Sequence, residues 1–218
     1  MFTVVVPAYN EEENIGKFLK ELTKKAKNII VVDDGSTDRT SSIARKFKVK
    51  LIRHRHNMGK SQAVITGIRA ARSDAVVLID GDNQLSPRYI PDFVKKLEEC
   101  DLVMGNRFLK SSQIPLHRLI ANLIIAKIIS VKIPEAGDPL NGLRALRKSK
   151  FKGLEGEGFG IDLEMLFMAK RRNLRICQLP VTADYSIQKG MSLPDYAKKT
   201  FRYAQLLLQS ISFLLASD

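Results

Sequence analysis

The sequence predicts a single α/β domain in which helices flank a mostly parallel central sheet. Short apolar runs rich in β-branched residues alternate with segments whose apolar residues recur at helical spacing. This alternation is typical of parallel strands joined by crossover helices. The chain has 218 residues, which is enough for one sizeable core and too few for two full domains of ordinary size. We therefore expect one domain over residues 1–218.

The expected elements are clearest in the first half of the chain. Apolar residues between Ile15 and Ala26 recur at helical spacing and join the first two apolar runs into a β-α-β unit. The second half is less regular, with helices expected over 161–172 and 195–215 and a strand over 174–181. The strands expected in the first half are 2–6, 29–33, 49–53, 75–79 and 101–104.

For two amphipathic segments, the sequence does not determine what their apolar faces contact. Residues 116–133 are largely apolar, but polar residues interrupt them well before the roughly 18 consecutive apolar residues of a membrane span. The helix expected over 195–215 separates an apolar face from a polar one. Either apolar face could lie in a membrane interface, pack on the sheet or form a homodimer contact.

The net charge indicates an anionic partner. The chain carries 36 Lys and Arg against 23 Asp and Glu, a formal charge of +13. Nucleic acid is not expected, because the basic residues are scattered over helix faces and no zinc-finger spacing or RNA-binding aromatic signature occurs. A membrane surface or a phosphorylated substrate would each account for the charge.

Cysteine usage favours a reduced, cytoplasmic compartment. Cys100 and Cys177 have neither a CxxC nor a metal-ligand spacing, so no disulfide is expected. The first residues show no signal-peptide pattern. His54 and His56 are interpreted as solvated loop residues rather than metal ligands.

Polar residues follow three of the expected strands, at 7–13, 33–38 and 80–84. In open parallel sheets, ligands bind at the carboxyl ends of the strands, so these segments are expected to line a site. Carboxylates can accept hydrogen bonds from a nucleoside, and a divalent cation held by Asp82 would neutralise a diphosphate. Each segment alone is equally consistent with ordinary turn and helix-cap chemistry.

Seven runs of the sequence carry more specific information than their composition. They are Val-Pro-Ala-Tyr-Asn-Glu-Glu-Glu-Asn-Ile at 6–15, Val-Asp-Asp-Gly-Ser-Thr-Asp at 32–38, Asn-Met-Gly-Lys-Ser-Gln-Ala at 57–63, Asp-Gly-Asp-Asn-Gln at 80–84, Gly-Asn-Arg at 105–107, Asp-Pro-Leu-Asn-Gly at 138–142 and Gly-Phe-Gly-Ile-Asp-Leu-Glu at 158–164. The first four runs resemble family 2 glycosyltransferases with the GT-A (nucleotide-diphospho-sugar transferase) fold. With the last three, the subgroup that the chain resembles is the dolichyl-phosphate (polyprenyl-phosphate) mannose or glucose synthases.

The resemblance implies that residues 1–110 bind the nucleotide-sugar and that residues 111–218 bind the acceptor. Asp82 and Gln84 would hold a divalent metal, Mg²⁺ or Mn²⁺. Asp82, Asp138 and Arg107 would be catalytic. The implied donor-binding residues are Pro7, Tyr9, Glu11, Asp34, Lys60, Asp80 and Gly81.

On the acceptor side, the resemblance implies that Arg107, Arg118 and Lys189 face a phosphate. The family's closing Gly-x-Ser-Lys motif, preceded by arginine, is replaced here by Gln-Lys-Gly-Met-Ser-Leu at 188–193. Asp138 is a candidate base or sugar-hydroxyl ligand, although a turn before Pro139 explains it equally well. Asp162 and Glu164 are interpreted first as helix-capping residues.

The expected function is metal-dependent, inverting transfer of mannose or glucose from a GDP- or UDP-sugar to dolichyl or polyprenyl phosphate. The enzyme would lie peripherally on the cytoplasmic face of a membrane. An acceptor phosphate is already an oxyanion and needs cations rather than a general base. Two alternatives stay open: a sugar or other hydroxyl acceptor, and a non-catalytic nucleotide-binding module.

Overall fold

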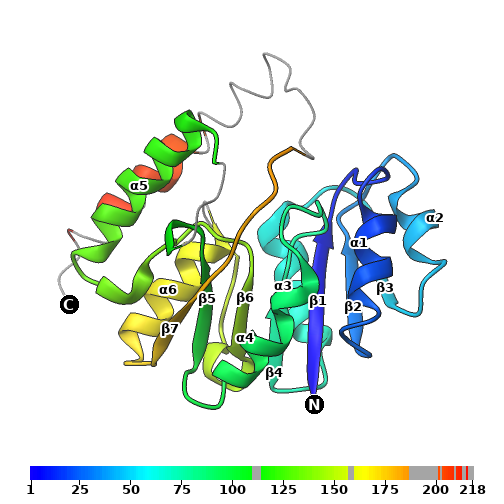
Figure 1. Cartoon of the computed structure of the whole chain (residues 1–218), viewed down its shortest axis with the longest axis horizontal. Helices are drawn as coiled ribbons and strands as arrows, with labels where there is room; N and C mark the ends of the chain where they lie inside the picture. Colours follow the sequence, from blue (N-terminus) through cyan, green and yellow to red (C-terminus); the bar gives the residue numbers. More distant parts are fainter. Residues whose placement is uncertain are drawn as a thin grey trace.

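A seven-stranded sheet with the order β3-β2-β1-β4-β6-β5-β7 forms the centre of the molecule (Figure 1). The computed structural model describes residues 1–109, 114–156 and 160–186, together with 201, 203–208, 210–212 and 215. Both pairings of β6 are antiparallel and the other pairings are parallel. Helices flank this mostly parallel sheet, which confirms the predicted fold class. The strands are β1 (Phe2–Ala8), β2 (Ile29–Asp33), β3 (Lys50–Arg53), β4 (Ala75–Leu78), β5 (Leu102–Asn106), β6 (Arg144–Arg147) and β7 (Ile176–Pro180). The helices are α1 (Ile15–Leu22), α2 (Thr40–Ala44), α3 (Lys60–Ala70), α4 (Ile90–Lys96), α5 (Leu116–Ser130) and α6 (Ile161–Arg171).

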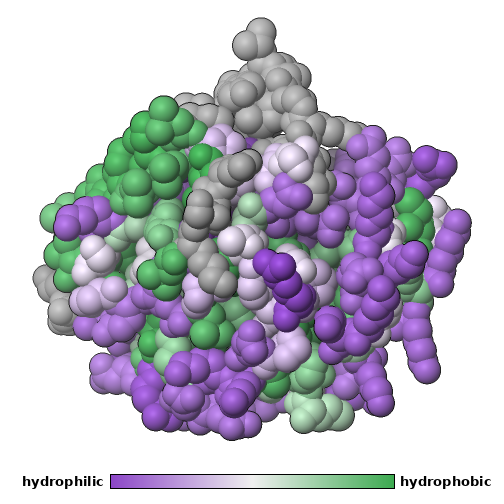
Figure 2. Space-filling model, in the orientation of Figure 1, coloured by the Kyte–Doolittle hydropathy of each residue, from purple (hydrophilic) through white to green (hydrophobic). Residues whose placement is uncertain are grey.

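Helix α5 lies beside the described part of the C-terminal segment (Figure 1). Residues 203–208 are helical, and Leu206 is buried in the core with Tyr203 and Leu207 packed against it. This segment therefore packs on the body of the domain at least through Leu206. A hydrophobic patch remains on the surface in the region of α5 (Figure 2). Among the described helices, none combines the length and the apolarity needed to cross a membrane.

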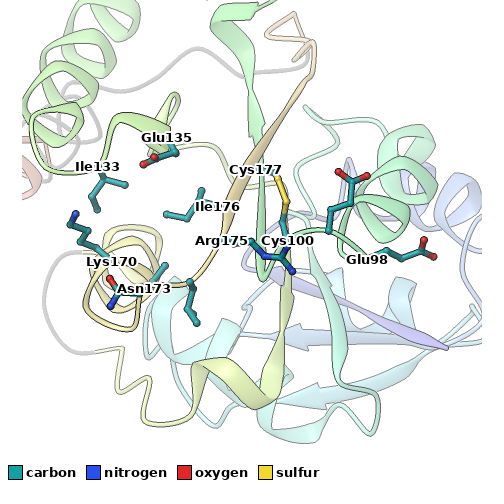
Figure 3. A pocket seen from close by; sticks show the side chains of 12 residues that line it. Glu98, Cys100, Ile133, Glu135, Lys170, Asn173, Arg175, Ile176 and Cys177 are labelled. Atoms are coloured by element: carbon teal, nitrogen blue, oxygen red, sulfur yellow. A yellow bond between two sulfur atoms is a disulfide. The ribbon is translucent and has the colours of Figure 1, made fainter.

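Cys100 and Cys177 form a disulfide, so the expectation of two unpaired cysteines was wrong (Figure 3). Parallel pairing of β5 with β7 sets Cys177 opposite Val103, and Cys100 lies just before β5, with a Cα–Cα distance of 6.1 Å. A spacing of 77 residues gives no local signature, because only the sheet brings the two thiols together. A cavity of about 790 Å³ lies beside the disulfide, and none of the predicted site residues lines it.

Loss of this disulfide is expected to lower the free energy of unfolding by about 4 kcal/mol, because a long loop is no longer closed in the unfolded chain. Urea unfolding of the wild type with and without reductant would measure the loss. The Cys100→Ser variant should show the lower stability and no response to reductant. Alkylation of both cysteines in the native, unreduced protein would contradict the disulfide.

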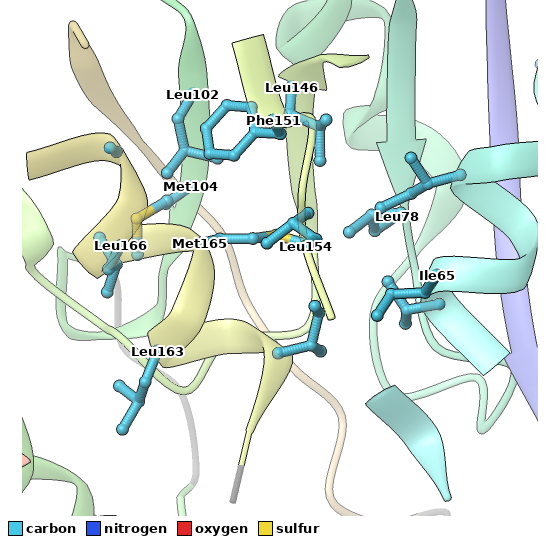
Figure 4. Packing of buried hydrophobic residues seen from close by; sticks show 14 of the residues in the cluster. Ile65, Leu78, Leu102, Met104, Leu146, Phe151, Leu154, Leu163, Met165 and Leu166 are labelled. Atoms are coloured by element: carbon cyan, nitrogen blue, oxygen red, sulfur yellow. The ribbon is translucent and has the colours of Figure 1, made fainter. Parts of the chain in front are cut away.

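The core has two halves, one on each face of the sheet. Side chains alternate along β1, so that Val5 packs with α3 and α6 while Val4 and Val6 pack with α1 and α4. Helices cover both faces, and β1 therefore consists almost entirely of apolar residues. Figure 4 shows α6 side chains such as Met165 and Leu166 packed near Met104 of β5.

Strand β6 was not predicted from the sequence. It has only four residues, and arginine stands at both ends. Arg144 pairs with Leu78 on one side and with Met104 on the other, so its side chain starts in the middle of the sheet. A strand that begins with a buried cation depends on partners elsewhere in the chain, and local patterning does not reveal those partners. The antiparallel direction of β6 brings residues 138–143 to the edge where the parallel strands end.

Candidate active site

Hydrogen bonds join the loops after β1 and β2 at the edge of the sheet where the parallel strands end. The backbone N–H of Asn10 donates to Ser36 Oγ at 3.0 Å, and Asn10 Oδ1 accepts from the N–H of Thr37 at 2.9 Å. The N–H of Glu11 donates to Thr40 Oγ1 at 2.8 Å. Two of the predicted donor-binding segments therefore form one surface.

Pro7 and Tyr9 stand at the start of this surface. Pro7 lies within β1, and its carbonyl accepts from the N–H of Gly81 at 3.3 Å. Tyr9 follows the strand and is 45% exposed, so its ring is accessible to a ligand. A Cβ at Gly81 would come within 3.2–3.4 Å of Ile15, Val6 and Ala8. A side chain at this position would therefore crowd the protein's own core, in addition to any close approach of a ligand.

Three carboxylates, Glu11, Asp80 and Asp82, share the space after β1 and β4. The pKa of Asp82 is raised to about 6, mainly by burial and then by the negative charges of Asp80 and Glu11. The hydrogen bond from the N–H of Gln84 acts in the opposite direction. That N–H donates to Asp82 Oδ1 at 3.0 Å. The cluster therefore holds more negative charge than its protein partners offset, which favours binding of a cation.

Lys60, at the first position of α3, links this cluster to the second half of the chain. Its Nζ lies 2.8 Å from Asp80 Oδ2 and 3.8 Å from Asp162 Oδ2. Asp162 stands in the first turn of α6 and also pairs with Lys60 beside the carboxylate cluster, so a role in the site stays a prediction for it. Glu164 instead accepts the N–H groups of Glu155 and Gly156 and holds that loop in place.

Arg144 is the fully buried cation behind this site. Its guanidinium donates to the carbonyls of Pro139 at 2.5 Å, Asn141 at 3.1 Å and Asp162 at 2.7 Å. Its Nε also lies 3.3 Å from Asp162 Oδ1. Burial lowers the pKa of Arg144, against the charges of Asp162, Asp138 and Asp80. One buried side chain thus holds both the 138–142 loop and the start of α6.

Asp34 is engaged by the loop before α3. It accepts the N–H groups of Met58 and Gly59 at 2.9 and 2.8 Å, and His54 Nδ1 lies 2.7 Å from its Oδ1. His54 Nε2 lies 3.0 Å from Thr66 Oγ1. His54, whose side chain is 9% exposed, is therefore a partner of Asp34, and its interpretation as a solvated loop residue was wrong. This arrangement gives Asp34 a role in orienting the 54–59 loop, and its contact with a nucleoside stays a prediction.

Arg107, which follows β5, forms a bidentate ion pair with Asp138. Nε and Nη2 of Arg107 donate to the two Asp138 oxygens at 2.6 and 2.8 Å, and Asp138 is fully buried. Although burial lowers the pKa of Arg107, the hydrogen bonds and charge of Asp138 raise it above its ordinary value. A buried carboxylate with both oxygens bonded to arginine is poorly placed to act as a general base, so the arrangement favours a role in orienting Arg107.

Arg107 and Arg118 meet on one tyrosine, although they come from different elements. Arg107 Nη1 donates to the hydroxyl of Tyr185 at 2.7 Å, and the Arg118 guanidinium lies 5.8 Å from the centre of the Tyr185 ring. Arg118 is only 9% exposed. The structure therefore brings together two of the three predicted phosphate-binding cations, while Lys189 lies outside the described residues.

Sequence reasoning missed Arg144 and Tyr185. Both lie close to residues that it did single out, because Arg144 follows the 138–142 run and Tyr185 precedes the 188–193 run. The available signal for Arg144 was an arginine flanked directly by apolar residues, Leu143 and Ala145. Nothing local distinguishes Tyr185, because its two arginine partners are far away in the sequence.

The carboxylate cluster suits a hard divalent cation such as Mg²⁺ or Mn²⁺, which prefers oxygen ligands. Within the described ranges, no three His, Cys, Asp or Glu side chains are arranged to hold a metal by themselves. Mg²⁺ commonly uses one or two carboxylates and takes its other ligands from water and substrate phosphates. Asp82, with its neighbours Asp80 and Gln84, fits that kind of site.

A GT-A-like α/β fold with carboxylates at the edge where the parallel strands end defines the class of protein. Residues 3–154 match the family described as glycosyl transferase family 2, and the chain belongs to this family. The fold agrees with solved structures of glucosyl-3-phosphoglycerate synthase from Mycobacterium tuberculosis. One of them, a complex with Mn²⁺, UDP and glucosyl-3-phosphoglycerate, superposes with a TM-score of 0.78 at 23% identity, covering 100% of this chain and 81% of that one.

Relatives at the sequence level include the dolichol-phosphate mannosyltransferase of Pyrococcus furiosus, which is 29% identical over 220 residues. That match covers 92% of this chain, which spans 62% of the relative. An uncharacterized protein of Methanocaldococcus jannaschii is 33% identical over 225 residues, covering 95% of this chain and 91% of the relative. The dodecaprenyl-phosphate galacturonate synthase of Rhizobium johnstonii is 32% identical over 160 residues, covering 66% and 47%.

Proposed function

We propose that this family 2 glycosyltransferase moves a hexose from a nucleotide-sugar to a polyprenyl phosphate, with inversion and with the help of a divalent cation. The observation that carries the proposal is the joining of two oppositely charged sites at one sheet edge. Carboxylates follow β1 and β4, and two arginines meet on Tyr185 beyond β5. The 138–144 segment connects the two sites. Asp138 pairs with Arg107 on the arginine side. On the carboxylate side, Arg144 pairs with Asp162, and Lys60 lies between Asp162 and Asp80.

The donor half of the proposal follows from charge. A nucleoside diphosphate would place its phosphates against the cation held by Asp82, with Lys60 as a second positive group nearby. A bound divalent cation stabilises the negative charge that develops on the leaving diphosphate. The solved M. tuberculosis relative contains Mn²⁺ and UDP, which supports the same donor class here. GDP- and UDP-sugars are both candidate donors.

The acceptor half follows from the arginines and from the state of Asp138. A phosphate acceptor brings its own oxyanion, whereas a hydroxyl acceptor needs a base close to the sugar. Asp138, the base first considered for a hydroxyl acceptor, is bonded through both oxygens to Arg107. Relatives named for dolichol phosphate and dodecaprenyl phosphate support the phosphate acceptor.

The test is an incubation of the purified protein with labelled GDP-sugars and UDP-sugars, undecaprenyl or dolichyl phosphate, and Mg²⁺ or Mn²⁺. Label that moves into the organic phase, and only when the lipid phosphate and the metal are present, is the expected result. Transfer only to a water-soluble hydroxyl acceptor would overturn the acceptor assignment. Nucleotide binding without any transfer or donor hydrolysis would favour the non-catalytic module.

We also propose that the protein docks on a membrane surface through α5; the Cys100–Cys177 disulfide removes the reason for assigning the cytoplasmic face. The exposed apolar side chains Leu116, Ile120, Leu123 and Ile124 recur at helical spacing on that helix, where Figure 2 shows the hydrophobic patch. Such a face can lie among lipid headgroups while Lys and Arg attract anionic lipid.

Replacing Ile120 and Ile124 with serine is expected to abolish co-flotation with vesicles that contain phosphatidylglycerol. The expected reason is the loss of apolar area from the docking face. A dimer that dissociates in this variant, with vesicle binding unchanged, would instead identify the face as a homodimer contact.

Replacing Arg118 with methionine is expected to raise the KM for polyprenyl phosphate by about 10- to 100-fold, the effect of losing a hydrogen bond to a charged group. The KM for the donor should change by less than about twofold, since Arg118 lies beside Tyr185 and not beside the carboxylates. Arg88→Met is the matched control, because Arg88 also stacks on a tyrosine, at 4.8 Å from the Tyr89 ring. Equal changes in both KM values would contradict the role of Arg118.

A further inference from the structure

We propose that Tyr185 is a positioning residue that holds Arg107 and Arg118 in the arrangement that binds the acceptor phosphate. The inference rests on the proposed function and assigns a role to a residue that does not itself touch the reacting atoms. Tyr185 contacts the two arginines through different parts of its side chain, the hydroxyl for Arg107 and the ring for Arg118.

The hydroxyl of Tyr185 completes the orientation of Arg107. A guanidinium has five N–H donors. Two of them bind Asp138, at 2.6 and 2.8 Å, and a third binds the Tyr185 hydroxyl at 2.7 Å. Within the described part of the chain, two N–H groups of Arg107 remain for a ligand. Since Asp138 and Tyr185 restrain the guanidinium from two directions, these donors keep a fixed direction, and a planar pair of N–H groups suits a phosphate.

The ring of Tyr185 provides a surface for Arg118. A guanidinium within about 6 Å of a tyrosine ring centre is attracted to the face of the ring. Arg118 meets this condition at 5.8 Å and is almost completely buried. Two cations on one side chain repel each other, and among the ion pairs of the described residues Asp138 pairs with Arg107 while none involves Arg118. An anion bound between the arginines would offset the remaining positive charge.

The backbone around Tyr185 is hydrogen-bonded both to the strand that precedes Arg107 and to the loop after β4. The N–H of Val181 donates to the carbonyl of Asn106 at 3.1 Å, next to Arg107. The N–H of Asp184 donates to the carbonyl of Gln84 at 2.9 Å, within the predicted metal-binding loop, and Ala183 pairs with Leu85 as an antiparallel bridge. Residues 181–186 therefore set Tyr185 at a defined position between the carboxylate cluster and the arginines.

Tyr89 supplies a matched control for a purely structural role. Its hydroxyl accepts from Arg88 at 2.7 Å and from the N–H of Thr182 at 3.0 Å, so it contacts an arginine and the same 181–186 segment. It has no contact with Arg107 or Arg118 among the hydrogen bonds and ring contacts of the described residues. Tyr89→Phe thus makes the same chemical change at a contact with the same segment, while the backbone contacts of Val181, Ala183 and Asp184 that position Tyr185 stay in place.

The experiment measures KM for undecaprenyl phosphate and for the donor in Tyr185→Phe, Tyr185→Leu and Tyr89→Phe. Tyr185→Phe keeps the ring but loses the hydroxyl, and the acceptor KM should rise by about tenfold. Tyr185→Leu loses both contacts and should show a larger rise. The donor KM should stay within about twofold in all three variants, and Tyr89→Phe should leave both KM values unchanged.

Two outcomes separate failure of the inference from failure of the proposed function. The first case is a wild-type enzyme that uses undecaprenyl phosphate. An unchanged acceptor KM in Tyr185→Phe, or an equal rise of the acceptor KM in Tyr89→Phe, would then overturn the role of Tyr185. A wild-type protein that transfers no sugar to the lipid would overturn the proposed function. In that case, calorimetry with geranyl phosphate tests the inference. Weaker binding by the Tyr185 variants, with wild-type binding by Tyr89→Phe, supports it. Equal binding by the wild type and all variants, or no binding by any of them, overturns it.

Discussion

Asp82→Asn is expected to lower sugar transfer by about a thousandfold or more, because the variant loses the ligand for the cation that stabilises the leaving diphosphate. Asp82 lies in a cluster with Asp80 and Glu11, where burial and those neighbouring charges raise its pKa. The substitution removes one of three mutually repelling carboxylates, so the metal-free variant should unfold at the same temperature as the wild type or at a higher one.

The measurements are transfer to polyprenyl phosphate at saturating Mn²⁺ and binding of the nucleoside diphosphate with and without metal. The wild type should bind the nucleotide more tightly with Mn²⁺, and Asp82→Asn should lose that gain. Asp74→Asn is the matched control, because Asp74 precedes β4 at the end opposite Asp82 and binds the N–H of Ser149. Wild-type turnover in Asp82→Asn would exclude the metal assignment.

Arg144→Met is expected to lower the free energy of unfolding by about 3–5 kcal/mol, the usual effect of removing one partner from a buried ion pair. The change removes the guanidinium that pairs with Asp162 and that donates to the carbonyls of Pro139 and Asn141. Urea unfolding followed by circular dichroism measures the difference. Transfer should also fall in the folded fraction, since these groups hold Asp138 and Asp162.

Arg147→Met is the control at the other end of β6. Arg147 donates to the carbonyl of Leu97 at 2.6 Å and is partly exposed, so its loss should cost about 1 kcal/mol or less. Arg144→Lys should not restore the wild-type stability, because an ammonium cannot reach three divergent carbonyls as a planar guanidinium does. Equal unfolding midpoints for Arg144→Met and the wild type would show that the buried cation is not required.

Much of the carboxylate edge could be predicted because parallel strands have a simple geometric property. Their carboxyl ends share one edge, so polar runs after separate strands must converge wherever the strands are correctly recognised. Glu11, Asp80 and Asp82 do converge in this way. The same reasoning located Asp34 but not its partners, because His54 and the N–H groups of Met58 and Gly59 come from a loop whose path depends on the fold.

By itself, the sequence determined the α/β class, the five strands of the first half, the helix that begins at Ile15 and the carboxylate edge. All of these follow from local hydrophobic periodicity and from residues adjacent to a strand. Tertiary structure alone decided the antiparallel β6, the Cys100–Cys177 bond and the meeting of Arg107 and Arg118 on Tyr185. Each of these features joins groups that are distant along the chain. Their physical basis is a buried charge, a thiol pair or an aromatic face that has a partner only after the sheet has formed.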